Sequence, residues 1–160
     1  MIKIPRTPSR RRPHFGQRKT GAVMVEMAII LNVFMLLVLG MLDLGLATYR
    51  YNTLSQAARQ GARQAIVRGS LAPPAMAAWG PVTYTGTAGD GSDYAKAVSP
   101  MLVGFVLDDV AIRIEWPDGG NSLQQRVRYT VTTEYRPIMT AFFSSSSYTQ
   151  SAASTMPIAH

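Results

Sequence analysis

The stretch AVMVEMAIILNVFMLLVLGMLDLGLA, from Ala22 to Ala47, decides the fold of this chain. It contains two charged residues, Glu26 and Asp43, and the 16 residues between them carry no charge. As a helix, Ala22 to Leu46 would be roughly 37 Å long, enough to cross a hydrocarbon layer of about 30 Å. A buried helix of a soluble protein is the alternative, but a chain of 160 residues has little material to surround such a segment. We therefore expect a single transmembrane helix.

Basic residues are concentrated ahead of this segment. Residues 1–21 hold seven Lys or Arg residues and no acidic residue, whereas residues 22–160 hold nine basic and nine acidic residues. The basic arm predicts a cytoplasmic N-terminus and a C-terminal part outside the cytoplasm. Because the excess charge is confined to this arm, we do not expect nucleic acid to be a partner.

The helix is expected to continue beyond the membrane. No proline or strong turn signal interrupts residues 48–68, and a Gly-Ser pair followed shortly by two prolines provides the stop. Ala57, Gly61 and Ala65 recur every four positions, a row of small residues that lets another backbone approach closely. This row either packs on the chain's own sheet or contacts another subunit, and the two alternatives are compatible.

Two alternating segments predict a β-hairpin in the part that follows. Apolar and polar residues alternate over 110–116 and again over 127–135, and the turn sequence PDGGN lies between them. A short strand near residues 82–85 and a weaker one at 148–156 would extend the sheet. Residues 94–106 have helical spacing, although their proline favours a short or kinked element.

The predicted fold class is therefore α+β, with a long N-terminal transmembrane helix continuing into a small antiparallel β-sheet head. Three segments are expected: a cytoplasmic basic leader at 1–21, a transmembrane and amphipathic helix at 22–68, and an exported head at 71–160.

The composition excludes several kinds of chemistry. Cysteine is absent, which removes disulfides, thiolate catalysis and cysteine-containing metal sites. The two histidines, His14 and His160, lie near the chain ends without metal-ligand spacing around them. The head offers no converging nucleophile, base and oxyanion group. We expect no enzyme activity, no metal site and no cofactor.

Two runs of this sequence together resemble the N-terminal half of the TadE-like pseudopilins of tight-adherence secretion systems. They are GAVMVEMAIILNVFMLLVLGMLDLG, which starts at Gly21, and AARQGARQAIVRG at 57–69. In that family a short basic leader ends in Gly, a Glu stands at the fifth mature position, and a hydrophobic helix follows. The chain departs from the family pattern at Met27, where an aromatic residue is usual, and at Asn32, where a proline inside the hydrophobic run is often found.

The resemblance implies that a prepilin peptidase cuts between Gly21 and Ala22, and that Glu26 is the assembly carboxylate. From the residues alone, Glu26 could equally be an interfacial carboxylate that reaches toward water. The implied function is a minor pseudopilin or pilus-assembly component of a tight-adherence (Tad) type IV pilus system. Its partners would be the bacterial inner membrane, the peptidase and other pilin-type or Tad subunits. The alternative is an uncleaved, signal-anchored periplasmic binding or sensor domain.

Overall fold

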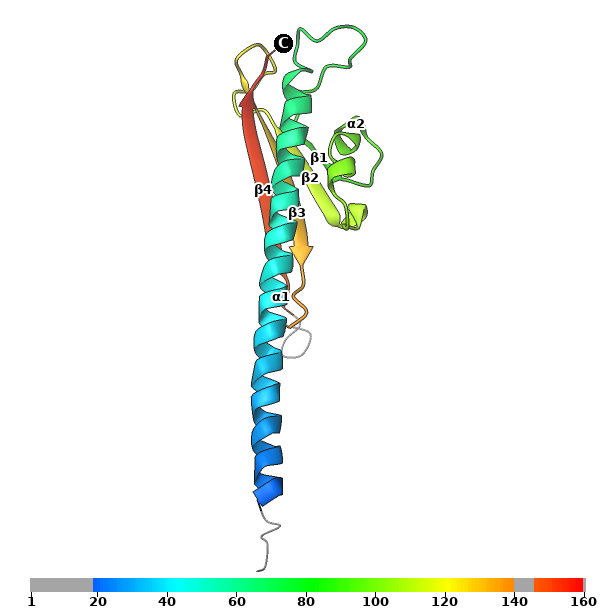
Figure 1. Cartoon of the computed structure of the whole chain (residues 1–160). Coiled ribbons are helices and arrows are strands. Elements are labelled where there is room, and N and C mark those ends of the chain that lie inside the picture. Colours follow the sequence, from blue (N-terminus) through cyan, green and yellow to red (C-terminus); the bar gives the residue numbers. More distant parts are fainter. Residues whose placement is uncertain (1–18, 140–145, 160) are drawn as a thin grey trace, which may run out of the picture. The chain divides into compact units, whose positions relative to one another are not determined.

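The structure, a computed structural model, describes residues 19–139 and 146–159 (Figure 1). They belong to two compact units, Met1–Val38 and Leu39–His160. Helix α1 (Lys19–Ile66) begins in the first unit and ends in the second. Most of the predicted basic leader lies outside the described residues, and its last three residues are already helical.

The first unit consists of the N-terminal part of α1. This part of the helix contains no proline, which permits a continuous helix. The side chains of residues 22–35 are all exposed. The most apolar 18-residue window of α1 has a mean hydropathy of 2.6, and none of that window is buried. The described part of the chain therefore contains one helix long and apolar enough to cross a membrane.

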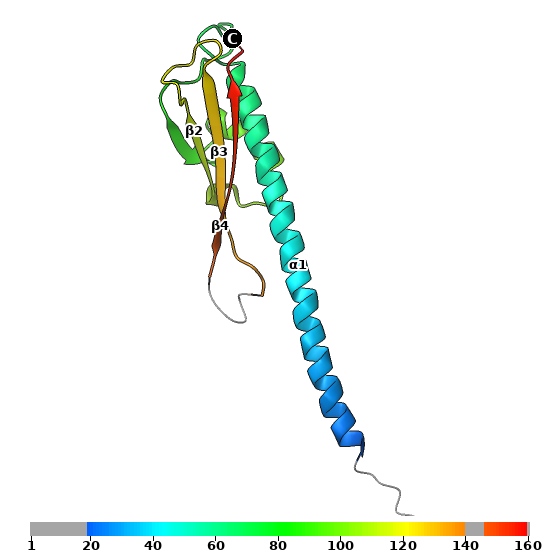
Figure 2. The same ribbon diagram turned by 90° about the vertical axis from the view of Figure 1, so that its left-hand side faces the viewer.

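The second unit contains a four-stranded antiparallel sheet with the order β1-β2-β3-β4 (Figure 2). Each strand pairs with the next one along the chain, and the register places Ile112 opposite Val131 and Val131 opposite Ala152. The strands are β1 (Tyr84–Thr87), β2 (Val110–Glu115), β3 (Arg126–Tyr135) and β4 (Tyr148–Pro157).

The core of this unit lies between the C-terminal part of α1 and one face of the sheet (Figures 1 and 2). Alternate residues of β2 and β3 are buried, as expected for strands with one covered face. Removing this apolar surface from water is the main term that stabilises the head. The central buried residues are Leu54, Ala57, Ala58, Gly61, Ala62 and Ala65 on α1, with Val110, Ile112, Ile114, Val127, Tyr129 and Val131 on the strands.

The predicted fold class is confirmed, and so is the hairpin formed by β2 and β3. The weaker strand predicted at 148–156 is β4, and β1 begins two residues later than the strand predicted at 82–85. The helical element expected within 94–106 is short, as its proline favours. The α-helical part is the single turn α2 (Asp93–Lys96), and a 3₁₀ turn at Ser99–Met101 follows it. Pro100 has no backbone N–H to donate, so it cannot continue the α-helix.

Candidate functional site

The residues predicted for processing and assembly lie in the first unit, on α1. Gly21, Ala22 and Glu26 are all exposed there. Glu26 lies four positions after Ala22 on the helix, which corresponds to a rise of roughly 6 Å, or about one helical turn. Glu26 has no hydrogen bond or ion pair with any described residue, so its carboxylate is available to a group from outside the monomer.

Around Glu26 the helix surface is apolar and uncovered. Met24 is 75% exposed, Met27 63% and Ile30 55%, on a segment whose side chains have no packing partner within the unit. Water is a poor solvent for so much contiguous apolar surface. This part of α1 therefore requires a lipid environment or other apolar helices around it.

The small-residue row Ala57, Gly61 and Ala65 lies in the second unit, buried in the core of its own head. A Cβ atom on Gly61 would lie 2.6 Å from the Tyr129 ring, so only a glycine permits this approach of helix and sheet. Packing on the chain's own sheet, one of the two alternatives for this row, is thus what the structure contains. A contact of the same row with another subunit stays a prediction.

Among the described residues Tyr129 is the largest fully buried side chain, and it links the core to α2. Its hydroxyl donates a hydrogen bond of 2.7 Å to the carbonyl oxygen of Tyr94. Burial raises the pKa of Tyr129 above its ordinary value, since the phenolate would lose its hydration. The residue therefore stays neutral and acts as a packing group with one satisfied donor.

Sequence reasoning missed the role of Asp43. This carboxylate, 8% exposed, accepts hydrogen bonds from the backbone N–H of Ile138 at 2.8 Å and of Met139 at 2.7 Å. The Tyr135 hydroxyl donates to the Asp43 carbonyl oxygen at 3.1 Å. Burial, and then the charge of Asp43, raise the pKa of Tyr135. A charged residue at the end of an apolar run is expected to have a hydrogen-bond or ion-pair partner. The sequence does not reveal that the partner of Asp43 is Ile138, which lies 95 positions later.

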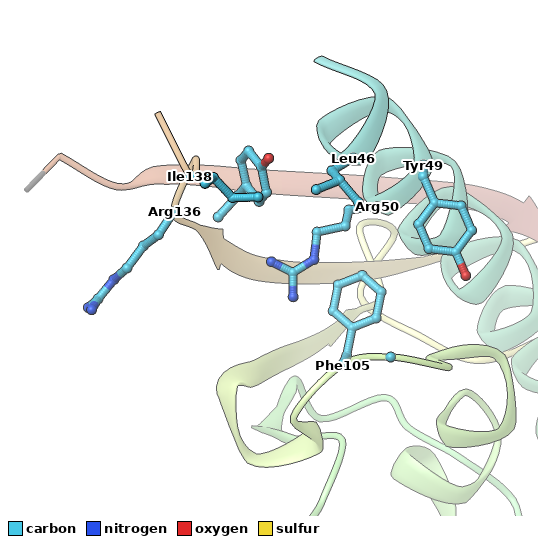
Figure 3. A pocket seen from close by; sticks show the side chains of 8 residues that line it. Leu46, Tyr49, Arg50, Phe105, Arg136 and Ile138 are labelled. Carbon is cyan, nitrogen blue, oxygen red and sulfur yellow. The ribbon is translucent and has the colours of Figure 1, made fainter. Parts of the chain in front are cut away.

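A cavity opens beside Tyr135, between α1 and the loop that precedes β2 (Figure 3). The guanidinium of Arg50 lies over the Phe105 ring, 4.7 Å from its centroid, and 5.5 Å from that of Tyr135. Such cation–π contacts hold the cation in place without neutralising it. Arg136 lies on the opposite rim and extends away from Arg50 in Figure 3.

Asp90 and the two tryptophans of the head have structural roles. Asp90 accepts hydrogen bonds from the Tyr84 hydroxyl and the Ser92 N–H, within the turn after β1. Trp79 and Trp116 are buried packing groups. Among residues 19–139 and 146–159, no group of three His, Cys, Asp or Glu side chains is placed to hold a metal ion.

Comparison with known proteins gives a match within helix α1. A search of the curated proteins found no match, and neither did a search of the solved structures. The family model described as TadE-like protein matches residues 21–63, which begin at the predicted processing site and end within the buried part of α1. The predicted resemblance is thereby confirmed over residues 21–63, where this chain matches the TadE-like family model.

Proposed function

We propose that the protein is a minor pseudopilin or assembly component of a tight-adherence type IV pilus system. The TadE-like match connects the chain with Tad pili. The observation that carries the finer assignment is the uncovered apolar surface of α1, which begins next to the unpaired carboxylate of Glu26. A helix of this kind can sit in a bilayer as a monomer and pack against similar helices in an assembly.

The basic arm sets the orientation in this proposal. Residues 1–21 carry seven positive charges, so the N-terminus stays in the cytoplasm and the head is exported across the inner membrane. A prepilin peptidase then cuts between Gly21 and Ala22. The new α-amine lies about one helical turn from Glu26, where it can pair with that carboxylate in the same chain or in a neighbour.

Mass spectrometry of the protein purified from membranes of its native host tests this function. The expected mature N-terminus is Ala22, with loss of the seven-positive leader. Gly21→Ala should slow the cleavage, whereas Gly45→Ala, a glycine replacement on the same helix at a position with open space around it, should leave it unchanged. An uncleaved N-terminus in a host with an active prepilin peptidase would instead support a signal-anchored periplasmic domain.

A further inference from the structure

The head carries a charged cavity that includes one residue of α1, Arg50. Its lining comprises two cations, Arg50 and Arg136, and two anions, Asp109 and Glu134, around a volume of about 540 Å³. The ion pairs among the described residues are Lys96–Asp93, Arg113–Glu115 and Arg126–Asp118. None of the four charges of the cavity is therefore neutralised by another described side chain.

An apolar pocket adjoins this charged cavity and shares Arg50 and Arg136 with it. Leu46, Tyr49 and Ile138 line the apolar side (Figure 3). Exposed apolar and aromatic side chains beside arginines are typical of the layer where a membrane meets water. The two pockets together form one amphipathic site.

The order of these groups follows the direction out of the membrane. On α1, Leu46 precedes Arg50 by four residues, a rise of roughly 6 Å, comparable with the depth of the headgroup layer. β3 runs antiparallel to α1, since Tyr129 faces Gly61 whereas Tyr135 bonds Asp43. Along β3 and its exit, Ile138 therefore lies beside the N-terminal end of the part of α1 that belongs to this unit, and Glu134 lies farther along, toward Gly61.

We propose that this site binds a zwitterionic phospholipid headgroup of the phosphoethanolamine class, in the outer leaflet of the membrane that α1 spans. Arg50 takes the phosphate, while Asp109 and Glu134 take the ammonium group. The lipid's ester region rests against Leu46 and Ile138. The sequence of groups in such a lipid, apolar chains, then phosphate, then amine, matches the sequence of groups in the site.

Two features of the site favour this ligand over a simple anion. The carboxylates of Asp109 and Glu134 would repel a second negative charge, but they attract an ammonium group that carries hydrogen-bond donors. Arg50 is held against the Phe105 and Tyr135 rings, so its donors are already oriented when the phosphate arrives. A choline headgroup has the same charges but no N–H donor, and a glycerol headgroup has no positive charge.

Native mass spectrometry of the full-length protein in detergent, titrated with single lipids, tests the proposal. Phosphatidylethanolamine should bind more tightly than phosphatidylcholine or phosphatidylglycerol. Arg50→Gln should weaken phosphatidylethanolamine binding by about tenfold, the loss typical of one charge-assisted hydrogen bond. The double variant Asp109→Asn/Glu134→Gln should abolish the preference over phosphatidylglycerol. Arg113→Gln, an exposed arginine of β2 outside the site, is the matched control and should have no effect.

Several results would overturn the proposal. Equal binding of the three lipids would do so, as would unchanged phosphatidylethanolamine binding by Arg50→Gln. If soluble glycerophosphoethanolamine displaced phosphatidylethanolamine at equal concentration, the natural ligand would be a soluble phosphoethanolamine compound and not a membrane lipid. Loss of cross-links to another protein in Arg50→Gln, with lipid binding intact, would identify a protein partner in place of the lipid.

This inference rests on the membrane anchoring included in the proposed function. Carbonate extraction of native membranes separates the two failures. If wild-type protein is released by carbonate, the anchoring itself fails. If the protein is retained in the membrane but shows no headgroup preference, the lipid site alone fails.

Discussion

The carboxylate of Asp43 accepts a hydrogen bond of 2.7 Å from the backbone N–H of Met139, a residue 96 positions later in the chain. The N–H of Ile138 donates to the same carboxylate at 2.8 Å. One side chain of α1 thus satisfies two successive backbone donors just after β3 ends. The pairing of β3 with β4 ends at Tyr135 and Tyr148, and beyond it Asp43 provides the acceptors that hold this segment against the helix.

Replacing Asp43 should loosen the head. Asp43→Ala removes the acceptor of both N–H groups, which are part-buried, so the cost should lie toward the lower end of the roughly 1–3 kcal/mol that an unsatisfied buried donor costs. We expect a lower urea midpoint for the detergent-solubilised protein, followed by the fluorescence of the buried Trp79 and Trp116. Asp93→Ala, at an exposed carboxylate in an ion pair with Lys96, is the control and should change little. Equal midpoints for the two variants would show that Asp43 does not stabilise the head.

Gly61 and Gly45 should respond in opposite directions to the same substitution. In Gly61→Ala the new Cβ would lie 2.6 Å from the Tyr129 ring, so helix and sheet must separate, at a cost of about 1–3 kcal/mol. Gly45 has open space around its Cβ position, and alanine there improves helix propensity by up to about 1 kcal/mol. Thermal unfolding followed by circular dichroism measures both. A neutral Gly61→Ala would contradict the close approach of α1 to β3.

The sequence predicted those parts of the fold that rest on local patterns. The alternation of apolar and polar residues over 110–116 and 127–135 indicates two half-buried strands, and the turn sequence PDGGN between them favours their pairing. The single turn of α2 could not be predicted from spacing alone. Where the α-helix ends ahead of Pro100 depends on tertiary contacts that periodicity does not record.

The candidate site was predictable only where a single helix carries it. Glu26 is conspicuous because it is a lone carboxylate in an apolar run. The partners of Asp43 and the surroundings of Arg50 come from loops and strands far along the chain. Their juxtaposition is a product of packing, so no local pattern signals it.

Asp118 should make the stability of the head depend on pH in the acidic range. Its carboxylate accepts hydrogen bonds from the side chain and the backbone N–H of Arg126, and these lower the pKa of Asp118 to about 2. A pKa below the ordinary value of 3.8 means that the contribution is present above about pH 4 and is lost as the pH falls toward about 2. The effect should be small, because the pair is at the surface.

Urea unfolding at several pH values between about 2 and 6 measures this dependence. Asp118→Asn should flatten the acid limb of the midpoint curve relative to wild type. Asp108→Asn, which replaces another exposed carboxylate of the head, should keep the wild-type curve apart from a constant offset. The interpretation fails if the two variants lose the same part of the pH dependence.

Glu26 should act in assembly more than in membrane insertion. The 16 uncharged residues that follow it are apolar enough to insert whatever side chain occupies position 26, so Glu26→Ala should remain in the membrane and should still be cleaved after Gly21. The variant loses the carboxylate that a neighbour's freed amine can pair with. Because Glu26 has no partner among the described residues of its own chain, this loss should not destabilise the monomer.

The expected phenotype is a stable, membrane-bound subunit that is poorly recovered with pilin-type partners after cross-linking and that supports few pili. Glu26→Gln separates charge from size, and it should behave like Glu26→Ala if the contact is ionic. Met27→Ala, which removes a neighbouring apolar side chain of the same exposed surface, is the control and should assemble far better. Normal piliation and normal cross-links in Glu26→Ala would leave the interfacial carboxylate as the explanation. Disappearance of the variant from the membrane would show that insertion and assembly both depend on Glu26.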